Sequence, residues 1–380
     1  MQALSDRIKT EAKRLGFTLA GITSADPPEH FDFYTDWLAQ GYHGEMAYLE
    51  TGRARTRRAD PRRILPECAS ILVLGFPYDA PRGGQTLGIP GRGRVASYAW
   101  GVDYHEVVLE RLEALVGFIE AEIGRPVPNR CYVDTGPLLE RDFAQRAGLG
   151  WIGKNTCLIH PQEGSCFFLA EILLGLPLDP DPAFTTDHCG TCTRCIEACP
   201  TDCILPDRTL DASRCISYLT IELKGPIPKS LRTGIGDWIF GCDVCQEVCP
   251  WNLRFASERG DPGLHSDPEF ARPILVEALG LDPEAFNRRF RDRPVKRAKR
   301  RGYLRNAAVA LGNAGSTAAV PALEAALLED PEPLVRGHAA WALGRIGGSR
   351  SSRALRRAAE IERDPDALAE IRAALQDDFP

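Results

Sequence analysis

Two cysteine-rich runs in the middle of the chain have the residue types and spacing of iron–sulfur ligands. Residues 189–200 contain four cysteines in the order C-x2-C-x2-C-x3-C-P, and residues 242–250 repeat the ending C-x2-C-x3-C-P. The first spacing is typical of a bacterial pair of [4Fe–4S] clusters, in which the fourth cysteine ligates the other cluster. The second run is one cysteine short, and Cys215, between the runs, can complete it.

The cysteines therefore predict a relay of two [4Fe–4S] clusters, which transfer electrons one at a time. The predicted ligand sets are Cys189, Cys192, Cys195 and Cys249 for one cluster, and Cys199, Cys215, Cys242 and Cys245 for the other. Cys203 follows Cys199 closely, which leaves open whether Cys203 or Cys215 completes the second set.

Zinc and disulfide bonds are the alternative uses of these cysteines. Zinc sites use C-x2-C pairs, but they do not need third and fourth cysteines at this spacing in two separate runs. A disulfide framework is typical of small secreted domains, and residues 1–6 show no apolar leader. We therefore expect a reducing compartment, the cytoplasm.

Composition and charge favour a globular protein of two or three domains. The chain has 380 residues and a net charge of −6, and no apolar stretch approaches the roughly 18 residues of a membrane helix. Two segments are nevertheless basic: residues 288–305 carry ten Lys or Arg against Asp292 alone, and residues 52–63 carry six Arg against Asp60. Basic patches on an acidic protein indicate local binding of an anionic partner.

Hydrophobic periodicity predicts an α+β domain over residues 1–176. The expected helices are 5–15, 32–50, 104–123 and 138–146. The expected strands are 71–74, 131–133, 156–159 and 165–174, the last two joined as a hairpin through 161–164, and residues 77–93 are expected to form a loop. A proline-rich linker at 177–182 separates this domain from the predicted cluster domain, 177–256.

The sequence Gly148-Leu149-Gly150-Trp151-Ile152-Gly153 satisfies the dinucleotide pattern G-x-G-x-x-G. That fingerprint must follow a strand and open a helix. Here the glycines follow a helix and lead into a strand, so a nucleotide site is not expected. A glycine-rich backbone still suits close approach to a large ligand.

The C-terminal part of the chain is repetitive. Residues 304–312 resemble residues 335–344, and residues 330–334 resemble residues 364–368, at a period of roughly 31 to 34 residues. This period predicts stacked helix pairs of the HEAT type over 303–380, after a basic connector at 257–302.

Five segments resemble the epoxyqueuosine reductase family, in the order of that family and over nearly the full length: residues 132–141, 147–154, 214–222, 241–252 and 304–313. The family is similar in its core to reductive dehalogenases. The resemblance implies an N-terminal cobalamin-binding α+β domain, a bacterial two-[4Fe–4S] ferredoxin-like domain and C-terminal HEAT-like α-helical repeats. It also implies reduction of epoxyqueuosine to queuosine at the wobble position of tRNA.

The resemblance implies that electrons pass from the clusters to cobalamin, giving cob(I)alamin, and that Asp134 is the proton donor. A general acid must hold a proton near neutral pH, and burial against the corrin would favour that form. The residue types alone favour a turn, because Asp before Thr-Gly-Pro is typical of a strand end or a helix cap.

The corrin contacts implied by the resemblance are Arg57, Ser97, Tyr98, Asp134, Lys154, Asn155, Ser217 and Tyr218. Each except Asp134 also has an ordinary interpretation as a surface charge or a loop hydroxyl. The cobalt-ligand signature D-x-H-x-x-G is incomplete, because Asp103-Tyr104-His105 is followed by Val108 at its last position. We therefore expect His105 to open the helix at 104 and not to ligate cobalt.

The partner implied is tRNA carrying epoxyqueuosine in its anticodon loop. The candidate phosphate contacts lie in the basic segment: Lys296, Arg297, Lys299, Arg300 and Arg305. A solvated charged connector is the alternative. We also expect an unidentified electron donor, no membrane association and a monomer.

Two other functions remain open. One is a cobalamin-dependent, dehalogenase-like reductase of a small organic molecule, which would need neither the repeats nor the basic segment. The other is a non-enzymatic two-cluster electron-transfer protein with a docking tail, which would bind no corrin.

Overall fold

The computed structural model describes residues 2–80, 89–257 and 260–376, so residues 81–88 of the predicted loop lie outside it. The chain forms two compact units from interleaved segments. Unit 1 comprises Met1–Gly83, Val102–Ala212 and Val244–Ser266, and unit 2 comprises Gly84–Gly101, Ser213–Asp243 and Asp267–Pro380. The contiguous domain boundaries stay a prediction. None of the helices within the described ranges is both long enough and apolar enough to span a membrane.

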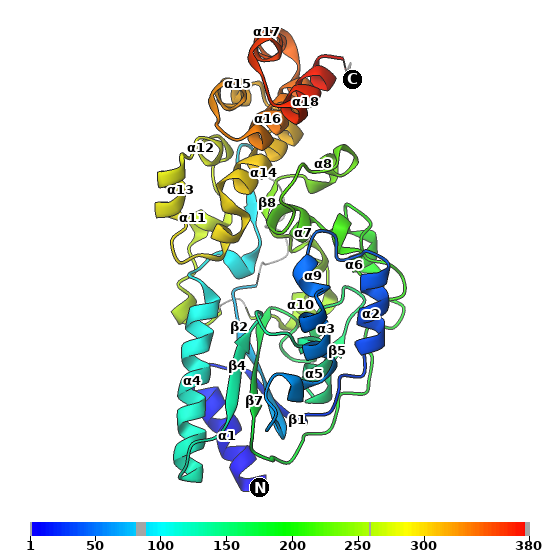
Figure 1. The fold of residues 1–380 in the computed structure, drawn as a ribbon, viewed down its shortest axis with the longest axis vertical. Helices are drawn as coiled ribbons and strands as arrows, with labels where there is room; N and C mark the ends of the chain where they lie inside the picture. Colours follow the sequence, from blue (N-terminus) through cyan, green and yellow to red (C-terminus); the bar gives the residue numbers. More distant parts are fainter. Residues whose placement is uncertain (1, 81–88, 258–259, 377–380) are drawn as a thin grey trace. The chain divides into compact units, whose positions relative to one another are not determined.

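Unit 1 is built on a four-stranded antiparallel sheet (Figure 1). In spatial order its strands are β1 (Leu19–Ser24), β2 (Ser70–Pro77), β7 (Phe167–Leu174) and β4 (Asn129–Val133). Seven of the eight residues of β2 are buried, as expected for a central strand covered on both faces. The antiparallel pairing confirms the α+β class and differs from the parallel sheet of a nucleotide-binding fold.

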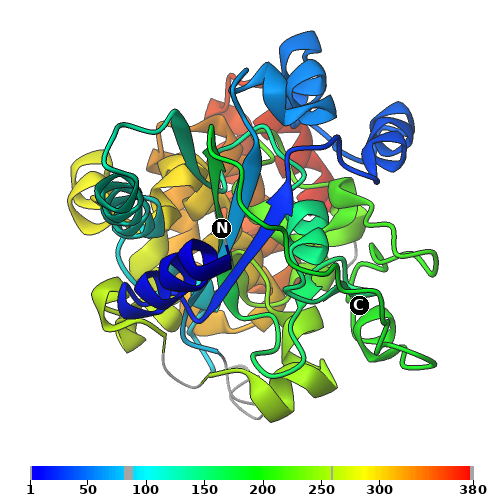
Figure 2. The ribbon, with the colours of Figure 1, turned by 90° about the horizontal axis from the view of Figure 1, so that it is seen from below.

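Helices cover both faces of this sheet (Figure 2). On one face lie α1 (Gln2–Arg14) and α4 (Tyr104–Ile123), which contact each other and the outer strands β1 and β4. On the other face, α5 (Glu140–Arg146) contacts β1, β2 and β7. The bounds of α4 match the prediction, because the Asp103 carboxylate caps its first turn and Gly124, in a left-handed conformation, ends it.

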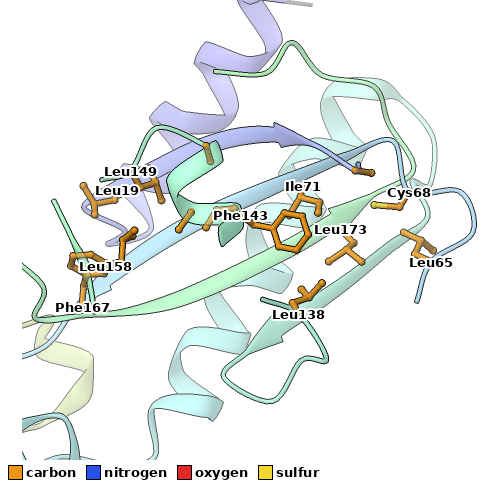
Figure 3. Close-up of a cluster of buried hydrophobic side chains, with 14 residues drawn as sticks. Leu19, Leu65, Cys68, Ile71, Leu138, Phe143, Leu149, Leu158, Phe167 and Leu173 are labelled. Atoms are coloured by element: carbon orange, nitrogen blue, oxygen red, sulfur yellow. The ribbon is translucent and has the colours of Figure 1, made fainter. Parts of the chain in front are cut away.

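The core between the sheet and α5 is apolar (Figure 3). Phe143 of α5 is fully buried against Ile71 of β2 and Leu173 of β7. Burying one such side chain stabilises the fold by roughly 1.5 to 3 kcal/mol. This core fixes the start of α5 relative to the end of β4, where the candidate acid lies.

The remaining elements of unit 1 are short. They are α2 (Phe31–Ala39), η1 (Ala47–Leu49), α3 (Gly52–Ala59), η2 (Pro61–Arg63), β5 (Trp151–Ile152), β6 (Leu158–Ile159), α6 (Arg194–Glu197), α9 (Val244–Glu247), α10 (Pro250–Phe255) and η5 (Pro262–Leu264), with η4 (Ala212–Arg214) at the unit boundary. The predicted helix 32–50 is wrong in its second half, since α2 ends at Ala39 and turns follow. The predicted hairpin is wrong in its strand pairing, because β6 pairs with β5 whereas β7 pairs with β2 and β4. The turn through 161–164 does form, closed by an antiparallel bridge between His160 and Gly164.

The glycine run is explained by the packing of the chain on itself. A Cβ atom on Gly150 would lie 2.1 Å from the carbonyl oxygen of Ile159, and Gly150 has φ +149°. A Cβ atom on Gly148, at φ +79°, would lie 2.7 Å from the carbonyl oxygen of Pro182. Only glycine fits these positions, so a large ligand is not needed to account for them.

Unit 2 is mainly helical. Its strands β3 (Arg94–Val95) and β8 (Trp238–Phe240) pair in parallel. Its helices are η3 (Ser97–Ala99), α7 (Ile216–Ile221), α8 (Lys229–Ile235), α11 (Pro268–Ala271), α12 (Leu275–Leu279), α13 (Pro283–Arg289), η6 (Pro294–Ala298), α14 (Lys299–Ala314), η7 (Thr317–Ala319), α15 (Val320–Glu329), α16 (Pro333–Ile346), α17 (Gly348–Ile361) and α18 (Pro365–Gln376). The predicted connector is thus more helical than a linker, with Leu275, Phe286 and Phe290 buried.

The C-terminal helices stack as the repeat pattern predicted. Helix α16 packs against α14, α15 and α18, and α17 packs against α15, α16 and α18. Gly312 allows the close crossing of α14 and α16, because a Cβ atom there would lie 2.7 Å from the ring of Trp341 and 2.9 Å from the Cα of Ala342.

Helix α14 is also bound to the N-terminal part of unit 2 by two fully buried polar side chains. The Arg305 guanidinium donates to the carbonyl oxygens of Leu219, Leu223 and Gly225. The Asn306 amide donates to the carbonyl oxygens of Thr220 and Ile239, at 2.8 Å each. These bonds join the first repeat helix to α7 and β8.

Candidate functional site

The two cysteine runs meet within unit 1. The short helices α6 and α9, one from each run, pack against each other. Cys249 is buried beside Trp151 in a small group of apolar side chains, and Cys189 packs against the same group. The Trp151 indole Nε1 lies 3.4 Å from Cys189 Sγ. Burial raises the pKa of Cys195 to about 11, and the nearby Cys189 and Cys249 thiolates add to this effect. The structure thus brings Cys189, Cys195 and Cys249 together, as one predicted ligand set requires.

Lys154 holds the cysteine loop. Its Nζ donates to the carbonyl oxygens of Gly190 and Cys192, at 2.8 and 2.9 Å. The family resemblance implies that Lys154 contacts the corrin, and the structure gives this side chain an additional role in the fold of the first run.

The donor set fits iron–sulfur clusters. Within the described ranges, no three His, Cys, Asp or Glu side chains are arranged around a single metal ion. A [4Fe–4S] cluster does not require such an arrangement, because each of its four thiolates binds a different iron. Six of the predicted ligands lie in unit 1, and Cys215 and Cys242 belong to unit 2.

Asp134 follows β4 and has the left-handed backbone angle φ 57°, which is uncommon for a residue with a side chain. Its Oδ2 accepts a 2.8 Å hydrogen bond from the Tyr104 hydroxyl and lies 3.9 Å from His105 Nε2. The other ring nitrogen of His105 lies 2.6 Å from Asp103 Oδ1. The Asp134 side chain is 65% exposed, so its carboxyl group is accessible to a ligand.

Tyr104 and His105 are functional candidates that the sequence analysis missed. In the sequence, Asp103, Tyr104 and His105 indicated only an incomplete cobalt signature and the start of a helix. That start is confirmed, but it also places the tyrosine and histidine beside Asp134. The Tyr104 ring stacks on Phe168 at a centroid distance of 3.9 Å, which fixes the hydroxyl that contacts Asp134.

Two buried carboxyl groups lie near Asp134. Glu171, on β7, is fully buried, and neither carboxyl oxygen has a hydrogen-bond partner among the described residues. Burial raises the pKa of Glu140 to about 8, with the charge of Asp134 adding to it, and the Glu140 carboxylate accepts from the Asp134 backbone N–H. Burial also raises the pKa of Glu171, with Glu140 and Asp134 as further causes. Burial therefore favours the neutral form of the Glu171 carboxyl group.

The raised pKa of Glu171 predicts a pH-dependent difference in stability between the wild type and Glu171→Gln. Because the folded chain holds the proton to a higher pH than the unfolded chain, the contribution of Glu171 is fully present below its unfolded pKa near 4.5 and is lost as the pH rises. The amide cannot ionise. As the pH rises, the free energy of unfolding of the variant should therefore increase relative to that of the wild type by up to about 1.4 kcal/mol per pH unit. Thermal unfolding of the anaerobic protein between pH 6 and 8.5 measures this, with the exposed Glu110→Gln as control. A difference that does not change with pH would contradict the assignment.

Two of the implied corrin contacts have unsatisfied buried atoms. Ser97 Oγ and Asn155 Nδ2 are buried and have no partner among the described residues, although the Ser97 backbone N–H donates to Asp243. Buried polar groups are normally hydrogen-bonded, so these atoms fit a bound group with its own donors and acceptors, such as the amide-bearing corrin. Arg57, Tyr98 and Ser217 are half-buried, whereas Tyr218 is buried in α7.

The Lys and Arg side chains of the basic segment fall into two groups: some are buried or paired within the fold, and others are accessible to solvent. Arg305 is fully buried and bound to carbonyl oxygens, so its assignment to tRNA is wrong. Arg300 pairs with Asp330 and donates to the Leu281 carbonyl, so it too is largely structural. Three candidates remain exposed: Lys296, Arg297, which pairs with Glu222, and Lys299.

Three family models match the chain. The model described as epoxyqueuosine reductase QueG, DUF1730 matches residues 58–135. A 4Fe-4S double cluster binding domain matches residues 188–252, and HEAT repeats match residues 298–377. The last two confirm the cluster and repeat predictions.

Individual proteins match over most of the chain. The chain is 42% identical over 348 residues to the epoxyqueuosine reductase of Pseudomonas aeruginosa, covering 90% of this chain and 95% of that protein. It is 35% identical to the epoxyqueuosine reductase of Bacillus subtilis over 98% of this chain and 95% of that protein. A solved epoxyqueuosine reductase with a tRNA-Tyr epoxyqueuosine-modified stem loop is 33% identical, with a TM-score of 0.90 and coverage of 99% and 98%.

Proposed function

Because the chain belongs to the epoxyqueuosine reductase family, we propose that it reduces the epoxide of epoxyqueuosine in the anticodon loop of tRNA to the alkene of queuosine. The observation that carries this function is the 42% identity over 90% of the chain. The epoxide oxygen leaves as water, so each turnover consumes two electrons and two protons.

The cofactors are two [4Fe–4S] clusters and cobalamin, which together supply single electrons and a strongly reducing, nucleophilic cobalt centre. For the clusters, the proposed ligands are the eight cysteines predicted from the spacing. For the corrin, Ser97 and Asn155 are supported by their unsatisfied buried atoms, and Arg57, Tyr98, Asp134, Lys154, Ser217 and Tyr218 stay proposals from the resemblance.

Asp134 is the proposed proton donor to the departing oxygen. Its carboxyl group is exposed, and the Tyr104 hydroxyl donates to Oδ2. This bond orients the carboxyl group and leaves Oδ1 to carry the proton that is transferred. His105 is a candidate for returning a proton to Asp134, because its Nε2 lies 3.9 Å from Oδ2 while Asp103 orients the ring.

Turnover of epoxyqueuosine-containing tRNA tests the function directly. The anaerobically reconstituted chain, given cobalamin and a chemical reductant, should convert the modified nucleoside to queuosine, measured by mass spectrometry of digested tRNA. Reduction of small epoxides or halides at a comparable rate, without the tRNA reaction, would favour the small-molecule alternative. Failure to bind cobalamin would favour the electron-transfer alternative.

We also infer a cytoplasmic monomer that receives electrons from a separate donor.

The exposed part of the basic segment is the proposed tRNA contact. Replacing Lys296, Arg297 and Lys299 together by Gln should weaken tRNA binding and reduce the slope of log affinity against log salt by about 2 to 3, since each phosphate contact contributes about 0.7 to 0.9. Binding titrations at several salt concentrations measure the slope. Arg353, Arg356 and Arg357 on α17 are also exposed, and their triple Gln variant removes the same charge. An equal effect of both variants would mean that net charge, not this contact, is responsible.

A further inference from the structure

Cys203 is the thiol that the proposed ligand sets leave out. It is 2% exposed, and its Sγ lies 3.4 Å from Sγ of Cys199, a proposed ligand. The four thiolates of a [4Fe–4S] cluster extend from four separate irons, so two sulfur atoms in direct contact cannot both ligate the same cluster. If Cys199 is a ligand, Cys203 is therefore not the fourth ligand of its cluster, and Cys215 fills that place.

Once a cluster is bound, the donor and the acceptor of the hydrogen bond between the two sulfur atoms are fixed. A ligating cysteine is deprotonated and can only accept hydrogen bonds. Because a thiolate has no proton to give, a hydrogen bond between the two sulfur atoms must be donated by the S–H group of Cys203. Other donors point at the same sulfur atom: the Thr201 hydroxyl lies 3.7 Å from it, and the backbone N–H groups of Thr201 and Cys203 also donate to it.

We propose that Cys203 donates an S–H hydrogen bond to the Cys199 thiolate and thereby raises the reduction potential of the cluster that Cys199 ligates. Hydrogen bonds to the sulfur atoms are among the groups that set the potential of such clusters. A donor stabilises the reduced cluster more than the oxidised one, because the reduced cluster carries one more negative charge. Cys203 would thus set the potential of the cluster assigned to Cys199, Cys215, Cys242 and Cys245, and not that of the other cluster.

The inference rests on the proposed cluster ligands and is tested on the full reconstituted chain without its tRNA substrate. Iron analysis and a redox titration followed by electron paramagnetic resonance give the cluster content and two midpoint potentials. In Cys203→Ala, eight irons should remain, one midpoint should shift to a lower potential, and the other should be unchanged. Cys203→Ser keeps a hydrogen-bond donor, so its midpoint potential should lie closer to that of the wild type. Cys68→Ala, which removes a buried thiol remote from both runs in the sequence, should shift neither.

Thr201→Val provides a second, independent variant that removes a donor from the same sulfur atom. It should lower the same midpoint potential, and it remains informative if Cys203→Ala fails to fold. Loss of four irons in Cys203→Ala would make Cys203 a ligand and overturn the proposal. Eight irons with unchanged midpoints in both variants would also overturn it. Fewer than eight irons in the wild type would instead contradict the cluster assignment itself.

Discussion

Replacing Asp134 by Asn is expected to abolish turnover while both cofactors stay bound. The amide has no acidic proton to give, and loss of a general acid typically costs about 10²- to 10⁴-fold in rate. The fold should tolerate the change, because Asn adopts the left-handed conformation that Asp134 has and the side chain is largely exposed.

Single-turnover conversion of epoxyqueuosine tRNA measures this effect, with cobalamin absorbance, iron content and tRNA affinity as parallel readouts. The matched control is Asp292→Asn, because Asp292 is also an exposed aspartate with a left-handed backbone, at φ 56°. The rate constant should fall while tRNA affinity is unchanged. Full activity of the Asp134 variant would remove the assignment, and loss of cobalamin would make Asp134 a binding residue instead.

Replacing Cys215 by Ala should remove one of the two clusters and abolish turnover. Cys215 precedes α7 at its N-cap position, where its side chain makes no capping hydrogen bond, so the loss of the thiol does not remove a cap. A [4Fe–4S] cluster with three protein thiolates is destabilised, and a relay with one cluster missing cannot deliver electrons to the reaction.

Iron content should fall from eight to about four per chain, with loss of one signal in the redox titration, since each cluster holds four irons. Cys131→Ala removes a thiol on β4 that the sequence assigns to no cluster, and it should keep eight irons. If Cys215→Ala also keeps eight irons, the fourth ligand of that cluster is another residue.

Local patterns predicted the parts of the fold that are determined by nearby residues. Helix α4 matches because its apolar spacing, the Asp103 cap and Gly124 all lie within the segment itself. The strand pairing could not be predicted in the same way. Strand β7 is adjacent in sequence to β6, but its two edges pair with β2 and β4, which are both more distant in the sequence.

The environment of Asp134 was only partly predictable. Tyr104, Glu140 and Glu171 reach it from three different elements, and no spacing rule records such tertiary neighbours. One signal was present: Glu171 is the only charged residue in the apolar strand Phe167–Leu174, and a lone carboxyl group in such a strand indicates a perturbed acid. Arg305 shows the opposite error, because a basic run in the sequence does not reveal which of its members the fold buries.

The buried side chains of Arg305 and Asn306 have a consequence for how far the chain can be shortened. They join α14 to α7, which begins directly after Cys215, and to β8, which ends shortly before Cys242. Deleting α14 would leave carbonyl oxygens of both segments without donors and would expose apolar residues, at a cost of roughly 1 to 3 kcal/mol for each unsatisfied buried group. The later helices also bind the chain between α7 and β8: His338 Nε2 of α16 accepts from the Ile227 N–H, and Glu370 of α18 pairs with the buried Arg232 of α8. The repeat helices therefore help to hold the segment between Cys215 and Cys242, and a chain shortened to end at Ala314 should lose stability there, because the buried Arg232 would lose its partner Glu370.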